Sequence, residues 1–134
     1  AFGKFKGCPF WSIEAYNFYI DQKSKSTALI AKNLRHEHTY PQILLIKKMW
    51  KLNNPTKKII RALFDQYAIA TVVTKEENLK LNSSAVGLRS DTISEKNIWL
   101  RYNNDKITIK VMENPIDNIF YKYHYKAMKE AQVI

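Results

Sequence analysis

A proline break between two apolar helical patterns restricts the fold of this chain more than any other feature. Before the break, residues 42–52 carry two adjacent apolar stripes, made of Ile43, Ile46 and Trp50 and of Leu45, Met49 and Leu52. So wide an apolar face predicts a mostly buried helix. Pro41 suits the first turn of this helix, because the amide hydrogen that proline lacks has no partner at that position.

The second helical pattern starts directly after the break. Asn54 can cap a helix there, and Pro55 can open it. The apolar residues that follow recur with the i, i+4 rhythm of a helix and are Ile59, Ile60, Leu63, Phe64 and Tyr67. Together the two patterns predict a helical hairpin.

A short strand and a capped helix are expected after this hairpin. Residues 69–74, IATVVT, are rich in β-branched and apolar side chains, which is typical of a strand. Thr74 and Glu77 have the spacing of a capping box, in which the hydroxyl holds the Glu77 amide while the carboxylate reaches back. We therefore expect a helix over 75–81.

The remaining patterns predict three more elements. Residues 12–22 are expected to form a helix capped by Ser12, while the state of residues 27–35 stays open. Thr92 and Glu95 predict a second capping box, before a helix that carries Ile98, Trp99 and Tyr102. Alternation over 106–112 predicts a half-exposed strand. Asn114 and Pro115 predict the start of a last helix, whose buried side carries Ile116, Ile119, Phe120, Tyr123 and Ala127.

These elements define an α+β fold, helix-rich with a small β-sheet, in which residues 1–134 form a single domain. The segment 81–91 combines Asn, Ser and Gly residues between patterned stretches. It is expected to be a mobile loop that carries a substrate contact.

Composition narrows the class of protein further. The chain has 134 residues, 46% of them hydrophobic, which excludes a disordered chain, a collagen and a multidomain enzyme. Its one cysteine, Cys8, is expected to be a small buried residue, and it fits a reducing compartment. No stretch predicts a membrane span or a signal peptide, so we expect a cytoplasmic protein without a membrane partner. The net charge of +10 favours an acidic partner, of which nucleic acid is the commonest.

Residues 36–38, His-Glu-His, are the densest group of acid, base and metal-binding side chains in the chain. Histidine accepts a proton near neutral pH, and a carboxylate binds hard divalent cations. If the segment is extended, His36 and His38 share one face and Glu37 lies on the other. The alternative is an exposed polar turn that leads into the helix over 42–52.

The run Glu37-His38-Thr39-Tyr40-Pro41 resembles the Asp-His-x-x-Pro motif that opens the HNH, or His-Me finger, nucleases. The strand and helix over 69–81 resemble the second half of that motif. The resemblance implies that Glu37 and Asn78 hold a divalent cation such as Mg²⁺, and that His38 is the catalytic general base. Segments 37–41, 72–77 and 99–102 also resemble uncharacterised bacterial proteins, for which no activity is implied.

Basic residues supply the candidate nucleic-acid contacts. They concentrate around the hairpin, at Lys47, Lys48, Lys51, Lys57, Lys58 and Arg61, where they can track a phosphate backbone or simply solvate a helical face. Arg101 can clamp a phosphate, and Trp99 and Tyr102 can stack on bases. The alternative for these two aromatic residues is the core. Residues 121–126 mix aromatic rings with positive charge, with Tyr123 expected in the core and Tyr121 and Tyr125 away from it.

Three functions follow from these patterns. The first is a nucleic-acid-binding protein that acts as a metal-dependent, HNH-like endonuclease. The second is a DNA- or RNA-binding module without catalysis, and the third is a basic domain that binds an acidic protein. A metal-free ribonuclease that uses His36 or His38 is a subordinate form of the first.

Overall fold

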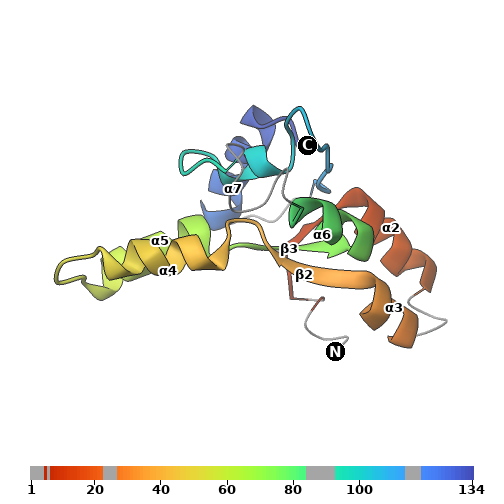
Figure 1. The fold of residues 1–134 in the computed structure, drawn as a ribbon, viewed down its shortest axis with the longest axis horizontal. Helices are drawn as coiled ribbons and strands as arrows, with labels where there is room; N and C mark the ends of the chain where they lie inside the picture. The colour runs from red at the N-terminus through yellow and green to blue at the C-terminus, as the bar shows by residue number, and fades with distance from the viewer. Residues whose placement is uncertain (1–4, 6, 23–26, 84–92, 114–118) are drawn as a thin grey trace.

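The structure is a computed structural model that describes residue 5 and residues 7–22, 27–83, 93–113 and 119–134 (Figure 1). It confirms the predicted α+β class, with helices around a small sheet. The sheet has the order β1-β3-β2, so β3 (Ala70–Thr74) is its central strand. Strand β1 (Phe10–Trp11) runs parallel to β3, and β2 (Leu34–His38) runs antiparallel to it.

Helices account for most of the regular structure in the described residues. Six α-helices and one short 3-10 helix are described, namely α2 (Ile13–Gln22), α3 (Thr27–Asn33), α4 (Gln42–Trp50), α5 (Lys57–Tyr67), α6 (Lys75–Leu81), η1 (Ile98–Arg101) and α7 (Ile119–Glu130). Figure 1 shows the α4–α5 hairpin extending away from the sheet, while the other helices lie around the sheet. None of the described helices is long and apolar enough to cross a membrane.

The helix starts at Ser12 and Thr74 form as predicted. The Thr74 hydroxyl accepts a hydrogen bond from the Glu77 amide at 3.1 Å, and the Glu77 carboxylate accepts one from the Thr74 amide at 2.9 Å. The Ser12 hydroxyl accepts from the Ala15 amide at 3.0 Å and donates to the same Glu77 oxygen at 2.6 Å. A single carboxylate oxygen therefore joins the starts of α2 and α6.

The sheet separates two clusters of buried side chains. Val73 belongs to the larger cluster, which includes Phe10, Trp99 and Met128. Val72, its neighbour on β3, belongs to the smaller one with Cys8, Trp11 and Leu34. Successive strand residues point to opposite faces, so the central strand supplies both clusters. Trp99 and Tyr102 are fully buried, and Cys8 is buried, which confirms the core interpretation of all three.

The expectation that α4 is mostly buried is wrong. Leu45 is its only buried residue, whereas Ile43 and Ile46 are exposed and Trp50 is 84% exposed. The reason is that the hairpin projects beyond the sheet, so most of the apolar face of α4 has no layer to pack against (Figure 1). The cap of α5 also differs from the prediction. Thr56 caps the helix by accepting from the Ile59 amide at 3.2 Å, while Asn54, with φ of 48°, forms the left-handed turn before it.

Two other predicted elements take a different form. The segment 106–112 has the expected alternation, with Ile107, Ile109 and Val111 buried, but it forms only isolated bridges through Thr108 and Val111 and no strand of the sheet. The helix expected near Trp99 is the short η1, and its cap is Asn97, whose side chain accepts from the Trp99 amide at 3.1 Å. Thr92 lies outside the described residues, as does most of the loop expected over 81–91.

The structure reverses two predictions for the last helix, in which Tyr123 was expected in the core and Tyr121 away from it. Tyr123 is 49% exposed, whereas Tyr121, His124 and Met128 are buried among the α7 side chains that the structure describes. Tyr121 stacks on Phe10, with 5.7 Å between ring centroids, and His124 accepts a hydrogen bond from the Trp99 indole. Tyr121 and His124 therefore take the buried positions on this helix, where the apolar periodicity had predicted Tyr123. The predicted start at Asn114 and Pro115 lies outside the described residues.

Candidate functional site

The antiparallel pair β2–β3 and helix α6 place the candidate site residues. Along β2, Glu37 is buried while His36 and His38 are exposed, as expected for an extended segment. Helix α6 follows β3 without a loop, because Thr74 ends the strand and caps the helix. Asn78, one turn into α6, is thereby brought near the end of β2.

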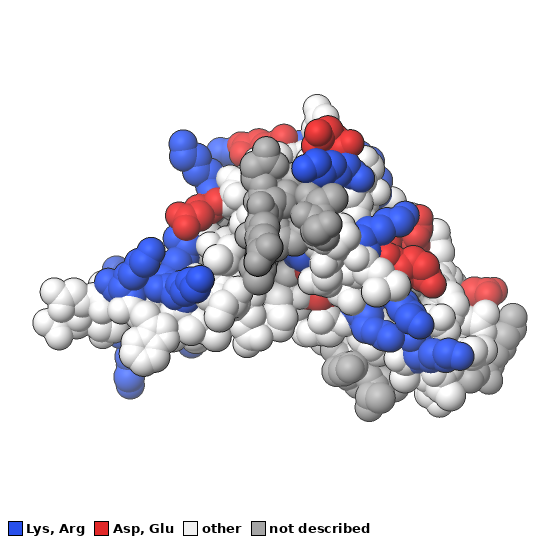
Figure 2. Space-filling view, in the orientation of Figure 1, with Lys and Arg blue, Asp and Glu red and all other residues white. Residues whose placement is uncertain are grey.

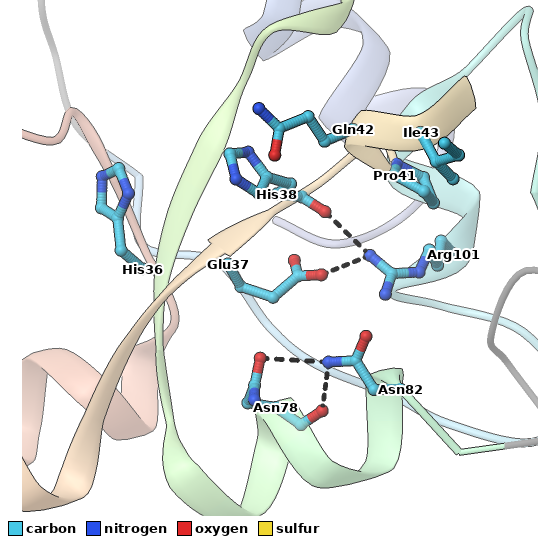
Figure 3. A pocket seen from close by; sticks show the side chains of 9 residues that line it. All are labelled: His36, Glu37, His38, Pro41, Gln42, Ile43, Asn78, Asn82 and Arg101. Carbon is cyan, nitrogen blue, oxygen red and sulfur yellow. Dashed lines mark hydrogen bonds and ion pairs between the residues drawn. The ribbon is translucent and has the colours of Figure 1, made fainter. Parts of the chain in front are cut away.

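The predicted catalytic and metal-binding residues Glu37, His38 and Asn78 line one pocket of about 280 Å³ together with Arg101, and we call it the HEH pocket. Its lining comes from β2, α4, α6 and η1 and consists of His36, Glu37, His38, Pro41, Gln42, Ile43, Asn78, Asn82 and Arg101. Figure 3 shows His36 apart from the others, while Glu37, Arg101 and the two asparagines lie around the hollow. Four of the predicted site residues, separated by up to 64 positions in the sequence, therefore share one space.

Glu37 is held by two donors at the floor of the HEH pocket. One carboxylate oxygen accepts from Arg101 Nη1 at 2.5 Å, and the other accepts from the Tyr102 hydroxyl. Both partners are buried, and the Glu37 residue is 5% exposed. Burial raises the pKa of the Glu37 carboxyl, and the charge of Arg101 and the Tyr102 hydroxyl offset part of this rise. Burial and the neighbouring carboxylate raise the pKa of Tyr102 well above its usual value, so its hydroxyl stays a donor.

Arg101 also ties the end of β2 to the end of α6. Its Nη1 contacts the carbonyl oxygens of His38 at 3.0 Å and Thr39 at 3.3 Å, and its Nη2 donates to the carbonyl of Leu81 at 3.1 Å. Among the described residues its buried Nε has no hydrogen-bond partner. Arg101 was predicted as a phosphate contact. With 3% of the residue exposed, it can serve in that way only for a group that enters the HEH pocket.

Asn82 also lines the pocket, although the sequence interpretation placed it only in the loop over 81–91 and did not single it out as a site residue. Its side-chain amide donates to the carbonyl of Asn78 at 2.8 Å and to the Asn78 side-chain oxygen at 3.2 Å (Figure 3). The two residues are four positions apart, which is the spacing of side chains that meet on a helix. That spacing was the signal available in the sequence. Asn82 therefore holds the Asn78 side chain in one orientation.

The arrangement around Glu37 does not fit a cation bound to that carboxylate. Both oxygens already accept hydrogen bonds, and the Arg101 guanidinium places a positive charge beside one of them. The residues that the structure describes also include no group of three or more His, Cys, Asp or Glu side chains that can hold a metal ion. A divalent cation on Glu37 therefore requires Arg101 to move away first.

The predicted basic residues line the hairpin formed by residues 42–67, which we call the basic hairpin. Lys47, Lys51, Lys57, Lys58 and Arg61 are exposed, and Lys48 is half-buried against the Tyr67 ring and Glu95. Figure 2 shows Lys and Arg side chains over this projection. Because Gln42 and Ile43 at the start of α4 line the HEH pocket, the basic hairpin leads directly away from it.

No protein-family model matches this chain, and neither a curated protein nor a solved structure matches it. Its function therefore has to be inferred from its own site and surface.

Proposed function

We propose that this chain binds nucleic acid along the basic hairpin and holds a phosphodiester of the bound strand in the HEH pocket. The observation that carries the proposal is the position of the pocket. It gathers His38, Asn78 and Arg101 at the base of an exposed hairpin that carries six cationic side chains. A polyanion that follows these cations passes the mouth of the pocket.

The side chains of the pocket suit a phosphate. Histidine, arginine and asparagine donate hydrogen bonds to phosphate oxygens, and the cations on the hairpin release condensed counterions from the backbone. Glu37 does not repel the phosphate as a free carboxylate does, because Arg101 and Tyr102 hold both its oxygens. The same ion pair keeps Arg101 in place at the floor of the pocket.

Salt dependence tests the binding proposal. Anisotropy of a fluorescent 20-mer, single-stranded or duplex, is measured with the protein over a range of salt concentrations. Contact with all six cations gives a slope of log K against log salt of about −4 for a single strand. An affinity that does not change with salt, or saturable binding to an acidic protein with none to DNA or RNA, contradicts the proposal.

A second candidate function is cleavage of the bound strand by an HNH-like site. It is favoured by the antiparallel strand pair followed by a helix, with Glu37, His38 and Asn78 around one pocket. In this proposal the exposed His38 takes a proton from water as the water oxygen attacks phosphorus, the bond to the leaving oxygen breaks, and solvent water protonates that oxygen. Mg²⁺ stays a prediction of the resemblance.

Plasmid and RNA cleavage distinguish catalysis from binding alone. Wild type, His38→Ala and His36→Ala are assayed with Mg²⁺, with Mn²⁺ and with EDTA. His36→Ala is the comparison variant because His36 lies on the same strand and the same exposed face, and cleavage lost in His36→Ala instead would make His36 the base. Cleavage lost only in His38→Ala supports the nuclease proposal, whereas equal cleavage by all three proteins points to contamination and rejects it. Salt-sensitive binding without cleavage leaves a non-catalytic binding module.

A further inference from the structure

Trp50 is the most exposed large apolar side chain that the structure describes. It ends α4 with 84% of its surface exposed, whereas Trp11 is 9% exposed and Trp99 is fully buried. Ile43 and Ile46 precede it on the same helical stripe, and they are also exposed. Large exposed apolar groups that gather on one surface mark an interaction site.

Charge around Trp50 restricts what can cover it. Residues 42–67 contain six Lys and Arg and a single acidic residue, Asp65. A second copy of the chain would bring the same excess of positive charge against its own, which is unfavourable. A partner that complements the basic hairpin combines negative charge with apolar surface, as the phosphates and base faces of nucleic acid do.

We propose that the basic hairpin is an arm for single-stranded nucleic acid, on which Trp50 stacks against an unpaired base. This inference rests on the proposed function and specifies its substrate. Only unpaired nucleotides offer the base face to a side chain, because the bases of a duplex are stacked on one another. Phosphates of the same strand meet Lys47 and Lys51, which flank Trp50 in the sequence.

The arm and the HEH pocket lie on one path. Ile43 lines the pocket, and Trp50 lies seven residues further along the same helix, a rise of roughly 10 Å. A strand stacked on Trp50 therefore has a phosphate within reach of the pocket. Trp50 sets which conformation of nucleic acid binds, and the pocket contacts the backbone.

Substitution of Trp50 tests this inference against single strands and a duplex. Labelled dT 20-mer, rU 20-mer and a 20-base-pair duplex are titrated with wild type, Trp50→Ala, Trp50→Phe and Leu29→Ala. Leu29 is the control because it is 45% exposed on α3, outside the hairpin. Loss of one base stack of about 1–3 kcal/mol weakens single-strand binding by about 5- to 150-fold in Trp50→Ala. Trp50→Phe retains most of the affinity, and duplex binding changes by less than about twofold.

The outcomes separate this inference from the proposed function. Wild type that binds neither single strands nor duplex rejects both. If wild type binds single strands and duplex, and Trp50→Ala weakens both equally or neither, the stacking arm is rejected and the proposed function is retained. A dimer in sedimentation equilibrium that dissociates in Trp50→Ala also overturns the inference, because a second copy then covers the patch. Tryptophan fluorescence that dT 20-mer quenches in wild type and not in Trp50→Phe supports it.

Discussion

The buried network at Glu37 and the basic hairpin use charge in opposite ways. At Glu37, one cation and one anion are removed from water, and hydrogen bonds engage both carboxylate oxygens. On the basic hairpin, five of the six predicted cations are exposed, and Lys48 forms the one ion pair described there, with a Glu95 side chain that is 66% exposed. The first arrangement fixes geometry, and the second leaves charge available to a partner.

This difference predicts where the molecule tolerates change. A buried charge that loses its partner pays the full desolvation penalty, whereas an exposed charge is solvated with or without one. Substitutions in the Glu37 network should therefore reduce stability, and substitutions on the basic hairpin should reduce binding while stability is retained.

Removal of Arg101 should have the largest effect. Arg101→Met leaves the Glu37 carboxylate buried without its cation and should lower the free energy of unfolding by about 3–5 kcal/mol. Urea denaturation measures the loss. The exposed pair provides the control, because Glu95→Gln should cost less than about 1 kcal/mol. The double variant Glu37→Gln, Arg101→Met should recover part of the loss, and an Arg101→Met protein as stable as Glu95→Gln contradicts the comparison.

Protonation of His124 at acid pH should lower the stability of the core around Trp99. This imidazole is 1% exposed, accepts from the Trp99 indole at 3.3 Å and donates to the Asp65 carbonyl at 2.8 Å, so it is held neutral. Burial lowers the pKa of His124, and between the unfolded value near 6.5 and the folded value only the unfolded chain binds the proton. The contribution of His124 to stability should therefore fall as the pH drops through about 6.5 toward the folded pKa, with a slope of at most about 1.4 kcal/mol per pH unit.

The contribution of His124 is measured as the difference between the free energies of unfolding of wild type and a His124 variant at each pH. Burial raises the pKa of the Glu37 and Glu77 carboxyls, and a raised pKa in the folded state favours folding as the pH falls, which opposes the effect of His124. Urea denaturation between pH 7.5 and 5.5 therefore compares wild type with His124→Gln. The two stability profiles should diverge below about pH 6.5, and parallel profiles are the result that excludes His124.

The two threonine caps should respond differently. Thr74→Ala and Thr56→Ala each remove the side-chain acceptor of a helix start and should cost about 0.5–2 kcal/mol. Thr74 lies in the sheet, so its loss should lower global stability. Thr56 lies at the end of the hairpin, so its loss should appear as faster hydrogen exchange confined to α5. Equal losses of global stability in both variants would show that the hairpin and the sheet unfold together.

Neutralisation of the turn-proximal lysines should have the smallest effect on stability. Lys57 and Lys58 are exposed, so the double change to Gln should alter the free energy of unfolding by less than about 0.5 kcal/mol. The salt dependence of single-strand binding should nevertheless weaken, with a slope smaller by about 1.4. A slope equal to that of wild type would place the backbone on another surface.

Local signals in the sequence predicted the elements that position the site. The capping box at Thr74, the β-branched strand before it and the proline break all depend on neighbours within a few residues, and each forms. The sequence left open whether residues 36–38 are extended or form a turn, and the structure shows the extended form, with Glu37 opposite the two histidines. The family resemblance named Glu37, His38 and Asn78, which line one pocket, although their roles stay predictions.

The errors arose where tertiary packing decides the outcome. The pairing of Glu37 with Arg101 joins residues 64 positions apart, and no local pattern reports it. The face of α7 depends on Phe10 and Trp99, which lie elsewhere in the chain and accommodate Tyr121 and His124. Trp50 was assigned to a buried face because apolar periodicity measures a stripe and not whether another layer covers it.

One carboxylate oxygen of Glu77 accepts a local and a long-range hydrogen bond, and the two bonds differ in what the chain must do before they can form. It accepts from the Thr74 amide, three residues away, and from the Ser12 hydroxyl, 65 residues away. The nearby contact can arise in an isolated fragment, but the distant one requires a closed chain. Helix α6 can therefore nucleate early, whereas α2 gains its anchor only after the sheet has assembled. One carboxylate oxygen thus serves both a local helix cap and a contact that joins α2 to α6 across 65 residues.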